Sequence, residues 1–262
     1  MDLDLKGKRV LVTGASKGIG LAIVTAFRAE GADVVGVSRR STPELKATGA
    51  TFVSGDLKSP GTPQRVVDEV LALDPRLDVL VNNAGGGVPT EETLADPFGG
   101  TAAVWSDTFA LNLNVAVETT RAALPALTRS RGAVVNISSQ NARDPRRAPL
   151  SYSAAKAALN SFSRGLAEQV AGSGVRVNVV TPSGTRTSAL LDKEGFGAEL
   201  AARMNLDHDK MLEMLPEHAG IVTGQLIDPA EIARAVLLLA SPTMPSVIGS
   251  NWLVDGGAHK TI

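Results

Sequence analysis

Seven short apolar runs recur along the chain, and most of them are followed directly by Gly, Asn, Asp or Ser. They comprise Arg9–Thr13, Asp33–Val37, Thr51–Ser54, Val79–Val81, Ala133–Ile137, Val175–Val180 and Trp252–Val254. Longer stretches of helical period separate them, as is typical of repeated βαβ units. Because the runs are nearly all apolar rather than alternating, we expect strands buried on both faces. The sequence therefore predicts an α/β fold with one doubly wound, seven-stranded parallel sheet between helix layers.

Composition and charge narrow the function classes. The 262 residues are 44% hydrophobic and 20% charged, enough for one sizeable core, and no linker or repeat divides them, so we expect a single domain. A net charge of −1 provides no global field for nucleic acid or an anionic membrane. The absence of Cys excludes disulfides, thiolate metal sites and Cys nucleophiles, and the three His residues lack metal-ligand spacing.

The N-terminal residues and the hydrophobic runs indicate where in the cell the protein is expected. Asp2 and Asp4 stand where a signal peptide would carry basic residues. The longest apolar runs, such as 235–240, fall far short of the ~20 residues of a membrane helix. We expect a cytoplasmic protein that does not span a membrane.

A glycine-rich turn follows the first predicted strand and reads Thr13-Gly14-Ala15-Ser16-Lys17-Gly18-Ile19-Gly20. Glycines let a backbone approach a pyrophosphate closely, and the N-terminus of the following helix supplies free N–H donors. We expect Gly14, Ser16, Lys17, Gly18, Ile19 and Gly20 to bind a dinucleotide. The spacing is Gly-x-x-x-Gly-x-Gly rather than Gly-x-Gly-x-x-Gly, and the alternative is a turn that binds no ligand.

The end of the second predicted strand bears on the choice of coenzyme. An NAD site usually places an acid there to hold the ribose hydroxyls, whereas this chain has Ser38-Arg39-Arg40. Arg residues can bind the 2′-phosphate of NADP through charge-assisted, bidentate hydrogen bonds, and Lys17 could reach the same phosphate. The pattern predicts a preference for NADPH over NADH; the alternative is an ordinary solvated Arg pair.

From Leu5 to Gly257 the chain resembles the short-chain dehydrogenase/reductase family, whose members have a single-domain, Rossmann-like fold. The resemblance is carried by motifs in order: Thr13-Gly14-x-x-x-Gly18-Ile19-Gly20, Asp56-Leu57, Asn82-Asn83-Ala84-Gly85, Leu111-Asn112-Leu113, Asn136-Ile137-Ser138-Ser139 and Tyr152-Ser153-Ala154-Ala155-Lys156. It implies an oxidoreductase that transfers a hydride between nicotinamide and a carbonyl or alcohol carbon. It also implies coenzyme contacts at Asp56, Leu57, Asn83, Ala84, Gly85, Pro182, Thr185 and Thr187, together with Tyr152 and Lys156.

Tyr152 is the only Tyr in the chain, and Lys156 lies four residues later on the same face of a helix. Lowering a phenol pKa by ~3 units requires about 4 kcal/mol of preferential stabilisation of the phenolate, which nearby positive charge can supply. We expect Tyr152 to act as general acid and base. The resemblance implies that Lys156 holds the nicotinamide ribose, Ser139 the substrate oxygen and Asn112 a relay water. Ser138 is assigned a structural role; the alternative for Asn112 is bonding to neighbouring backbone.

Two segments depart from the family pattern. Ser183 replaces the Gly that usually follows Pro182, and Gln140-Asn141-Ala142-Arg143 follows Ser139 in place of a small residue and Gly. Arg143, Arg146 and Arg147 could dock an acidic carrier protein, so one alternative is a 3-oxoacyl thioester reductase. A non-catalytic NADPH-binding regulator is another, although Tyr, Lys and Ser are all present.

The stretch from about 187 to 227 mixes helical pattern with charges and Met residues, and we expect it to form a substrate loop or lid. Its apolar residues either line a substrate pocket or pack on the sheet. Asp228 and Pro229 predict the start of a further helix. Family members are usually dimers or tetramers, and the Ala residues beside Tyr152 would permit close helix approach, so we expect a homo-oligomer and a small-molecule carbonyl or alcohol substrate.

Overall fold

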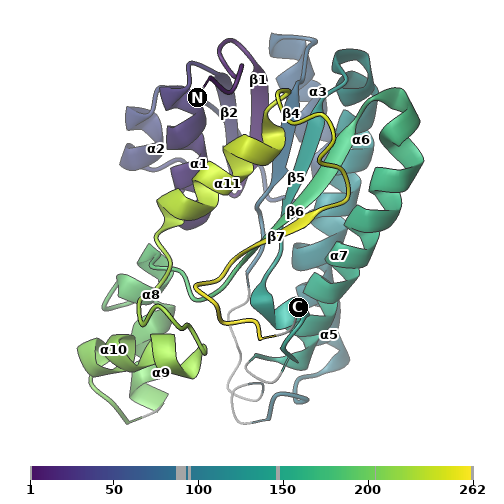
Figure 1. Ribbon diagram of the computed structural model, residues 1–262. Helices are drawn as coiled ribbons and strands as arrows, with labels where there is room; N and C mark the ends of the chain where they lie inside the picture. The colour runs from purple at the N-terminus through teal and green to yellow at the C-terminus, as the bar shows by residue number, and fades with distance from the viewer. Residues whose placement is uncertain (1, 87–92, 94–95, 146–147, 204, 261–262) are drawn as a thin grey trace.

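The computed structural model describes residues 2–86, 93, 96–145, 148–203 and 205–260 (Figure 1). Its seven strands form one sheet in the order β3-β2-β1-β4-β5-β6-β7, and every neighbouring pair is parallel. The strands are β1 (Arg9–Thr13), β2 (Asp33–Ser38), β3 (Thr51–Ser54), β4 (Val79–Asn82), β5 (Ala133–Ile137), β6 (Arg176–Pro182) and β7 (Asn251–Val254). All seven predicted strands are confirmed, and β6 is displaced, beginning after Val175 and extending to Pro182.

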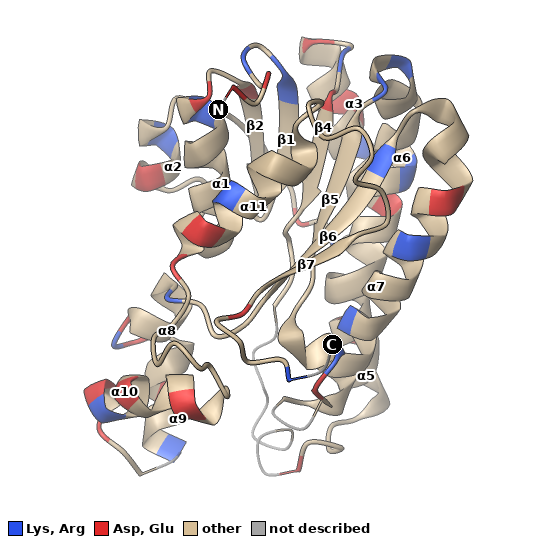
Figure 2. Cartoon of the chain, in the orientation of Figure 1, with Lys and Arg blue, Asp and Glu red and all other residues tan. Residues whose placement is uncertain are grey.

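Helices cover both faces of the sheet (Figure 1). One face packs against α1 (Gly18–Ala29) and α11 (Pro229–Ala240), and α2 (Pro43–Ala47) joins them through Leu45. The other packs against α3 (Thr62–Leu73), α6 (Val115–Ser130) and α7 (Leu150–Val170). Within the strands, charged residues occur only at the first positions of β1, β2 and β6, as Figure 2 illustrates by the tan strands. This doubly wound, Rossmann-like arrangement in one domain confirms the predicted fold class.

Local sequence signals explain how the helices begin and end. Ile23, Val24 and Phe27 form the fully buried face of α1, and Gly31 beyond its end has a φ of 76°, where a side chain would be strained. Asp228 caps α11 as predicted: its side chain accepts from Ala230 N at 2.8 Å, while Glu231 accepts from Asp228 N at 3.2 Å.

Most of the remaining short elements lie at the carboxyl ends of the strands. They are α5 (Ala102–Phe109), the π-helix η1 (Ala110–Asn114), the 3₁₀ turn η2 (Gln140–Ala142), α8 (Ser188–Leu191), α9 (Phe196–Arg203) and α10 (His208–His218). The 3₁₀ turn η4 (Ala171–Ser173) follows α7 at the opposite end of the sheet. In the described chain, no helix is both long and apolar enough to cross a membrane.

The predicted substrate segment is helical rather than an open loop. Helices α8, α9 and α10 form a lobe that stands away from the sheet in Figure 1. The chain segments that enter and leave the lobe are bonded to each other. Arg186 N donates to Ile227 O at 2.9 Å, and the Arg186 side chain pairs with Asp228 at 3.1 Å. Met211 on α10 is buried and belongs to neither of the apolar clusters on the sheet, so this residue does not extend the core of the sheet.

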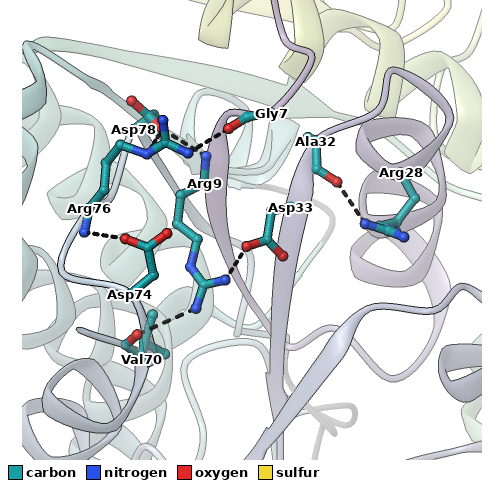
Figure 3. Close-up of polar contacts among 9 residues, drawn as sticks. All are labelled: Gly7, Arg9, Arg28, Ala32, Asp33, Val70, Asp74, Arg76 and Asp78. Carbon is teal, nitrogen blue, oxygen red and sulfur yellow. Dashed lines mark hydrogen bonds and ion pairs between the residues drawn. The ribbon is translucent and has the colours of Figure 1, made fainter. Parts of the chain in front are cut away.

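At the amino ends of the strands, Arg9 links three elements (Figure 3). The Arg9 guanidinium pairs with Asp33 on β2 and lies 3.5 Å from the Val70 carbonyl on α3. The backbone N–H of Arg9 donates to the Asp78 carboxylate at 2.7 Å. The Arg9 side chain is 5% exposed and that of Asp33 46% exposed. Removal of Arg9 therefore costs buried hydrogen bonds without leaving a fully buried carboxylate.

We expect Arg9→Leu to lower the free energy of unfolding by about 1–2 kcal/mol, measured by urea denaturation, while leaving enzymatic activity intact. Arg164→Leu is the control, because Arg164 and Glu168 form an exposed pair worth about 0.3–0.5 kcal/mol. A loss from Arg9→Leu no larger than that of the control would contradict this account of the cluster.

Candidate active site

A cleft of about 1040 Å³ opens at the carboxyl ends of the strands, where the order of strands reverses between β1 and β4. Every residue that the sequence assigned to the coenzyme lines it: Gly14, Ser16, Lys17, Gly18, Ile19, Gly20, Ser38, Arg39, Arg40, Asp56, Leu57, Asn83, Ala84, Gly85, Tyr152, Lys156, Pro182, Thr185 and Thr187. Ser139 lines it as well. The fold thus brings these separated motifs together in one hollow.

The glycine turn is shaped by close backbone contacts. Gly14 and Gly18 have φ angles of 67° and 56°, which disfavour other residues. A Cβ atom on Gly20 would lie 2.1 Å from the Gly14 carbonyl oxygen. Asn83 fixes the turn against β4, since its Nδ2 donates to Thr13 O at 2.9 Å and Gly14 O at 3.1 Å. The turn is thus a rigid concave backbone surface that fits a pyrophosphate.

Basic side chains gather at one end of the cleft. Lys17, Arg39 and Arg40 are exposed at its rim, and among the described residues no carboxylate pairs with them. Ser38 Oγ donates to the Arg40 carbonyl at 2.8 Å, which holds the backbone of this turn. Sequence reasoning missed Thr42, which lines the cleft and donates to Ser16 O at 2.9 Å. The donor set suits a phosphate group.

Tyr152 and Lys156 project from α7 toward the other end of the cleft, beside Ser139 at the end of β5. Lys156 is 4% exposed, and its Nζ donates to Ile137 O at 2.9 Å. Burial lowers the pKa of Lys156 to about 8. Burial also raises the pKa of Tyr152, while the hydrogen bond with Ser139 acts in the opposite direction. In the protein alone, Tyr152 is therefore a proton donor, and the lowered pKa expected from the sequence requires further positive charge.

Asn112 differs from the other predicted catalytic residues. It is buried in the π-helix η1 and does not line the cleft. Its Oδ1 accepts from Gly86 N at 2.9 Å, and its Nδ2 donates to Gly86 O at 2.9 Å and Thr108 O at 3.0 Å. The side-chain amide thus holds the backbone that follows β4. The bond to Thr108, four positions earlier, is the alternative noted from the sequence, whereas the two bonds to Gly86 were not predicted.

Buried polar residues behind the cleft connect the strands that carry the site. Asn82 Nδ2 donates to Asn136 Oδ1 and Thr120 Oγ1, both at 2.8 Å. Asn136 Nδ2 in turn donates to Ser163 Oγ at 2.8 Å. This network ties β4 and β5 to α6 and α7. The two Asn residues within otherwise apolar strands were its only sequence signal, and their partners are set by tertiary packing.

The depressed pKa of Lys156 predicts a stability effect with a defined sign. Its value falls from 10.5 to about 8, so the unfolded chain binds the proton more tightly between these pH values. The free energy of unfolding should therefore rise with pH across this window. Below pH 8 the buried charge is destabilising, and we expect Lys156→Met to stabilise the coenzyme-free protein by about 2 kcal/mol at pH 7.

Urea denaturation between pH 6 and 10 measures this effect, with the exposed Lys46→Met as control. The difference between the Lys156 variant and wild type should shrink as pH approaches 10. A destabilised Lys156→Met protein at pH 7, or a difference independent of pH, would show that the folded protein stabilises the buried ammonium.

The fold, the glycine-turn cleft and the Tyr–Lys–Ser group at its end define a protein of the nicotinamide-dependent oxidoreductase class. The chain belongs to the short-chain dehydrogenase family, whose model matches residues 8–204. Its activity is accordingly that of an NAD(P)-dependent oxidoreductase acting on alcohol or carbonyl groups.

Relatives and solved structures match along the whole chain. The 2,3-dihydro-2,3-dihydroxybenzoate dehydrogenase of Escherichia coli (strain K12) is 34% identical and covers 98% of both chains. The L-fucose dehydrogenase of Mus musculus is 34% identical over 97% of this chain and 89% of its own. The structure of L-sorbose reductase from Gluconobacter frateurii, complexed with NADPH and L-sorbose, is 30% identical, covers 100% of both chains and has a TM-score of 0.89.

Proposed function

We propose that this protein is an NADPH-preferring oxidoreductase that interconverts a carbonyl and an alcohol, with Tyr152 as general acid and base. The observation that carries the proposal is the placement of Tyr152, Lys156 and Ser139 at one end of the same cleft whose other end presents the glycine turn and the Arg pair. The bound coenzyme would supply or accept the hydride. The protein would bind and orient both reactants and move the proton.

Tyr152 carries the proton step. Its raised pKa keeps the phenol protonated at neutral pH, so it can donate to the substrate oxygen during reduction. Ser139 contacts Tyr152 through a hydrogen bond and would hold the same oxygen. Positive charge brought beside the phenol would favour the phenolate, which is the form that removes the proton during alcohol oxidation. Lys156, next to Gly85, would hold the ribose hydroxyls and add to that charge.

The coenzyme preference rests on the basic rim. Arg39 and Arg40 follow β2 at the position where a ribose-binding acid would repel a 2′-phosphate. Both are exposed and without a carboxylate partner among the described residues. Asp56 and Leu57 would contact the adenine, and Pro182, Thr185 and Thr187 would flank the nicotinamide. We assign Asn112 a positioning role as well as the water-binding role that the family implies.

The substrate and assembly complete the proposal. The relatives named above act on small molecules, by their names, and we propose a free small-molecule substrate rather than a carrier-bound thioester. Of the predicted docking patch, Arg143 is exposed, and Arg146 and Arg147 lie outside the described residues. We also propose that copies associate through α7 and β7, where Ala157 and Leu253 are exposed; sedimentation equilibrium would measure the oligomer.

A coenzyme-consumption assay tests the proposal. Purified protein is mixed with NADPH or NADH and a panel of ketones, ketoses and 3-oxoacyl thioesters, and coenzyme absorbance is followed. We expect NADPH to be oxidised with much higher kcat/KM than NADH, with a free ketone as substrate. Tight NADPH binding without turnover in either direction would favour the non-catalytic regulator, and preference for the thioesters would favour the carrier-bound alternative.

A further inference from the structure

A second cavity, of about 370 Å³, lies at the amino ends of the strands, opposite the coenzyme cleft. Lys8, Asp78 and Gly132 line it directly before β1, β4 and β5, and Arg176 lines it as the first residue of β6. Its volume falls within the range of small-molecule sites. The proposed reaction does not use this cavity, because hydride and proton transfer take place at the other end of the strands.

The charged side chains that line the cavity are mostly cationic. Lys8 and Arg131 have no hydrogen-bond or ion-pair partner for their side chains among the described residues. Asp78 is the one carboxylate among the described lining residues, and it is already engaged (Figure 3). It accepts from the Arg9 backbone N–H at 2.7 Å and lies 3.3 Å from the Arg76 guanidinium. The free charge in the cavity is therefore positive.

Arg176 adds a third, buried cation. It is 7% exposed, and its guanidinium donates to the carbonyls of Leu239, Ala240 and Ser241 at 2.7, 2.9 and 3.0 Å. A guanidinium carries five N–H groups, so at least two have no acceptor among the described residues. Buried donors of this kind are normally paired, and an anion in the cavity would accept from them.

Helix ends beside the cavity reduce the positive charge without cancelling it. Helices α6 and α11 and the α7–η4 pair all end there, and each carboxyl end carries about −0.5 elementary charge. Their combined charge of about −1.5 is smaller than that of the three cations Lys8, Arg131 and Arg176. The cavity therefore favours an anion.

The backbone of Arg131 gives independent evidence that its side chain matters here. It has a φ of 51° and a ψ of 47°, a left-handed conformation that favours glycine. Its side-chain stem lies on Gly174, where an added Cβ would stand 3.1 Å from Arg131 Cγ and 3.3 Å from Cδ. The chain thus keeps a positioned Arg at a strained position where glycine would be relaxed, which points to a role for the charge.

The rest of the lining is apolar. Leu5, Val79 and Ala133 form buried parts of the wall, and Pro245 and Ile248 are exposed on the loop that follows α11. An inorganic anion would satisfy the cations but leave these surfaces in water. An alkyl chain attached to the anion would cover them, which is favourable.

We propose that this cavity binds an aliphatic carboxylate, whose head group is held by Lys8, Arg131 and Arg176 and whose chain covers the apolar wall. The volume has room for roughly ten to twelve non-hydrogen atoms, since one water occupies about 30 Å³. Octanoate, with ten non-hydrogen atoms, is therefore the probe. The proposal is independent of the proposed function, because binding at this site requires no turnover.

Calorimetric titration of the NADP⁺-loaded protein tests the proposal. One octanoate per chain should bind at least about 10-fold more tightly than butanoate, because each buried methylene contributes about 4-fold. It should also bind at least about 10-fold more tightly than octan-1-ol, which has the chain without the charge. Inorganic phosphate or butanoate as tight as octanoate would refute the role of the chain. Octan-1-ol as tight as octanoate would refute the role of the cations, and no octanoate binding would overturn the proposal.

Two single substitutions assign the site. Arg131→Gly and Lys8→Met should each weaken octanoate binding by about 10-fold. Because glycine relaxes the left-handed backbone, Arg131→Gly should melt no earlier than wild type, so a lost affinity would not reflect unfolding. Arg129→Ala removes the same charge from the exposed last turn of α6 and is the matched control. Wild-type affinity in both test variants, or an equal loss in Arg129→Ala, would contradict the assignment.

Comparison with coenzyme-free protein separates the two sites. The cavity and the coenzyme cleft lie at opposite ends of the strands, so NADP⁺ should change the Kd of octanoate by less than about 3-fold. Octanoate that binds coenzyme-free protein at least about 10-fold more tightly would instead occupy the coenzyme cleft, and the proposal would be wrong. None of these outcomes alters the test of the proposed function, which depends on turnover with a ketone.

Discussion

Replacing Tyr152 with Phe should lower kcat/KM for carbonyl reduction by about 10³-fold, which lies within the range that general acid catalysis contributes. The change removes one hydroxyl group from the only Tyr in the chain. Its ring fills the same space on α7, so the fold and the cleft should persist. Initial rates with NADPH and a ketone measure the effect, and NADPH affinity measured by fluorescence should change by less than about 3-fold.

Phe162 and Ser161 lie further along the same helix, and Ser161 is exposed. Ser161→Ala, which likewise removes one hydroxyl from α7, is therefore the matched control and should retain wild-type rates. A Tyr152→Phe protein that keeps a tenth or more of the wild-type kcat/KM would assign the proton transfer to another group. Loss of NADPH affinity in the same variant would instead indicate a damaged cleft.

The double substitution Arg39→Ala/Arg40→Ala should weaken NADPH binding by about 10²- to 10³-fold, because a hydrogen bond to a charged group contributes about 1.5–3 kcal/mol. NADH lacks the 2′-phosphate, so its Kd should change little. Fluorescence titration of each coenzyme provides both values. The preference for NADPH over NADH should also fall steeply with ionic strength, since both side chains are exposed.

Arg121→Ala/Arg129→Ala removes the same charge from the exposed surface of α6 and serves as the control. It should leave both coenzyme affinities near wild type. Equal weakening of NADPH and NADH by the Arg39/Arg40 variant would mean that these residues hold a group common to both coenzymes. In that case the basic rim would not explain a preference.

The fold was predictable because its physical causes are local. The five central strands are buried almost throughout and are apolar along their length, which made them visible as runs such as Ala133–Ile137. The edge strands β3 and β7 are partly exposed, so the expectation of burial on both faces is wrong for them. The capping pair of Asp228 and Glu231 likewise marks the start of α11 in the sequence itself. The helical lobe between Thr187 and Ile227 was less predictable, since its buried residue Met211 belongs to neither of the apolar clusters packed on the sheet.

The candidate site likewise has residues that could be predicted from the sequence and contacts that could not. Motif residues such as Gly20 and Lys156 could be placed because family resemblance and spacing both pointed to them. Contacts that depend on tertiary packing could not: nothing in the sequence indicates that Asn112 holds Gly86, or that Gln140 faces Ala219. The pKa of Tyr152 is a further case, because burial raises it in the protein alone while the sequence argument considered only charged neighbours.

Transfer of deuterium from NADPH that is labelled at both hydrogens of C4 tests the central claim most directly. A ketone that the wild-type protein consumes is incubated with the labelled coenzyme, and the alcohol product is analysed by NMR. The account predicts one deuterium atom on the carbinol carbon with wild-type protein and no labelled product with Tyr152→Phe. A product that carries no deuterium at that carbon, or no reduction of any ketone on the panel, would contradict hydride transfer in this cleft.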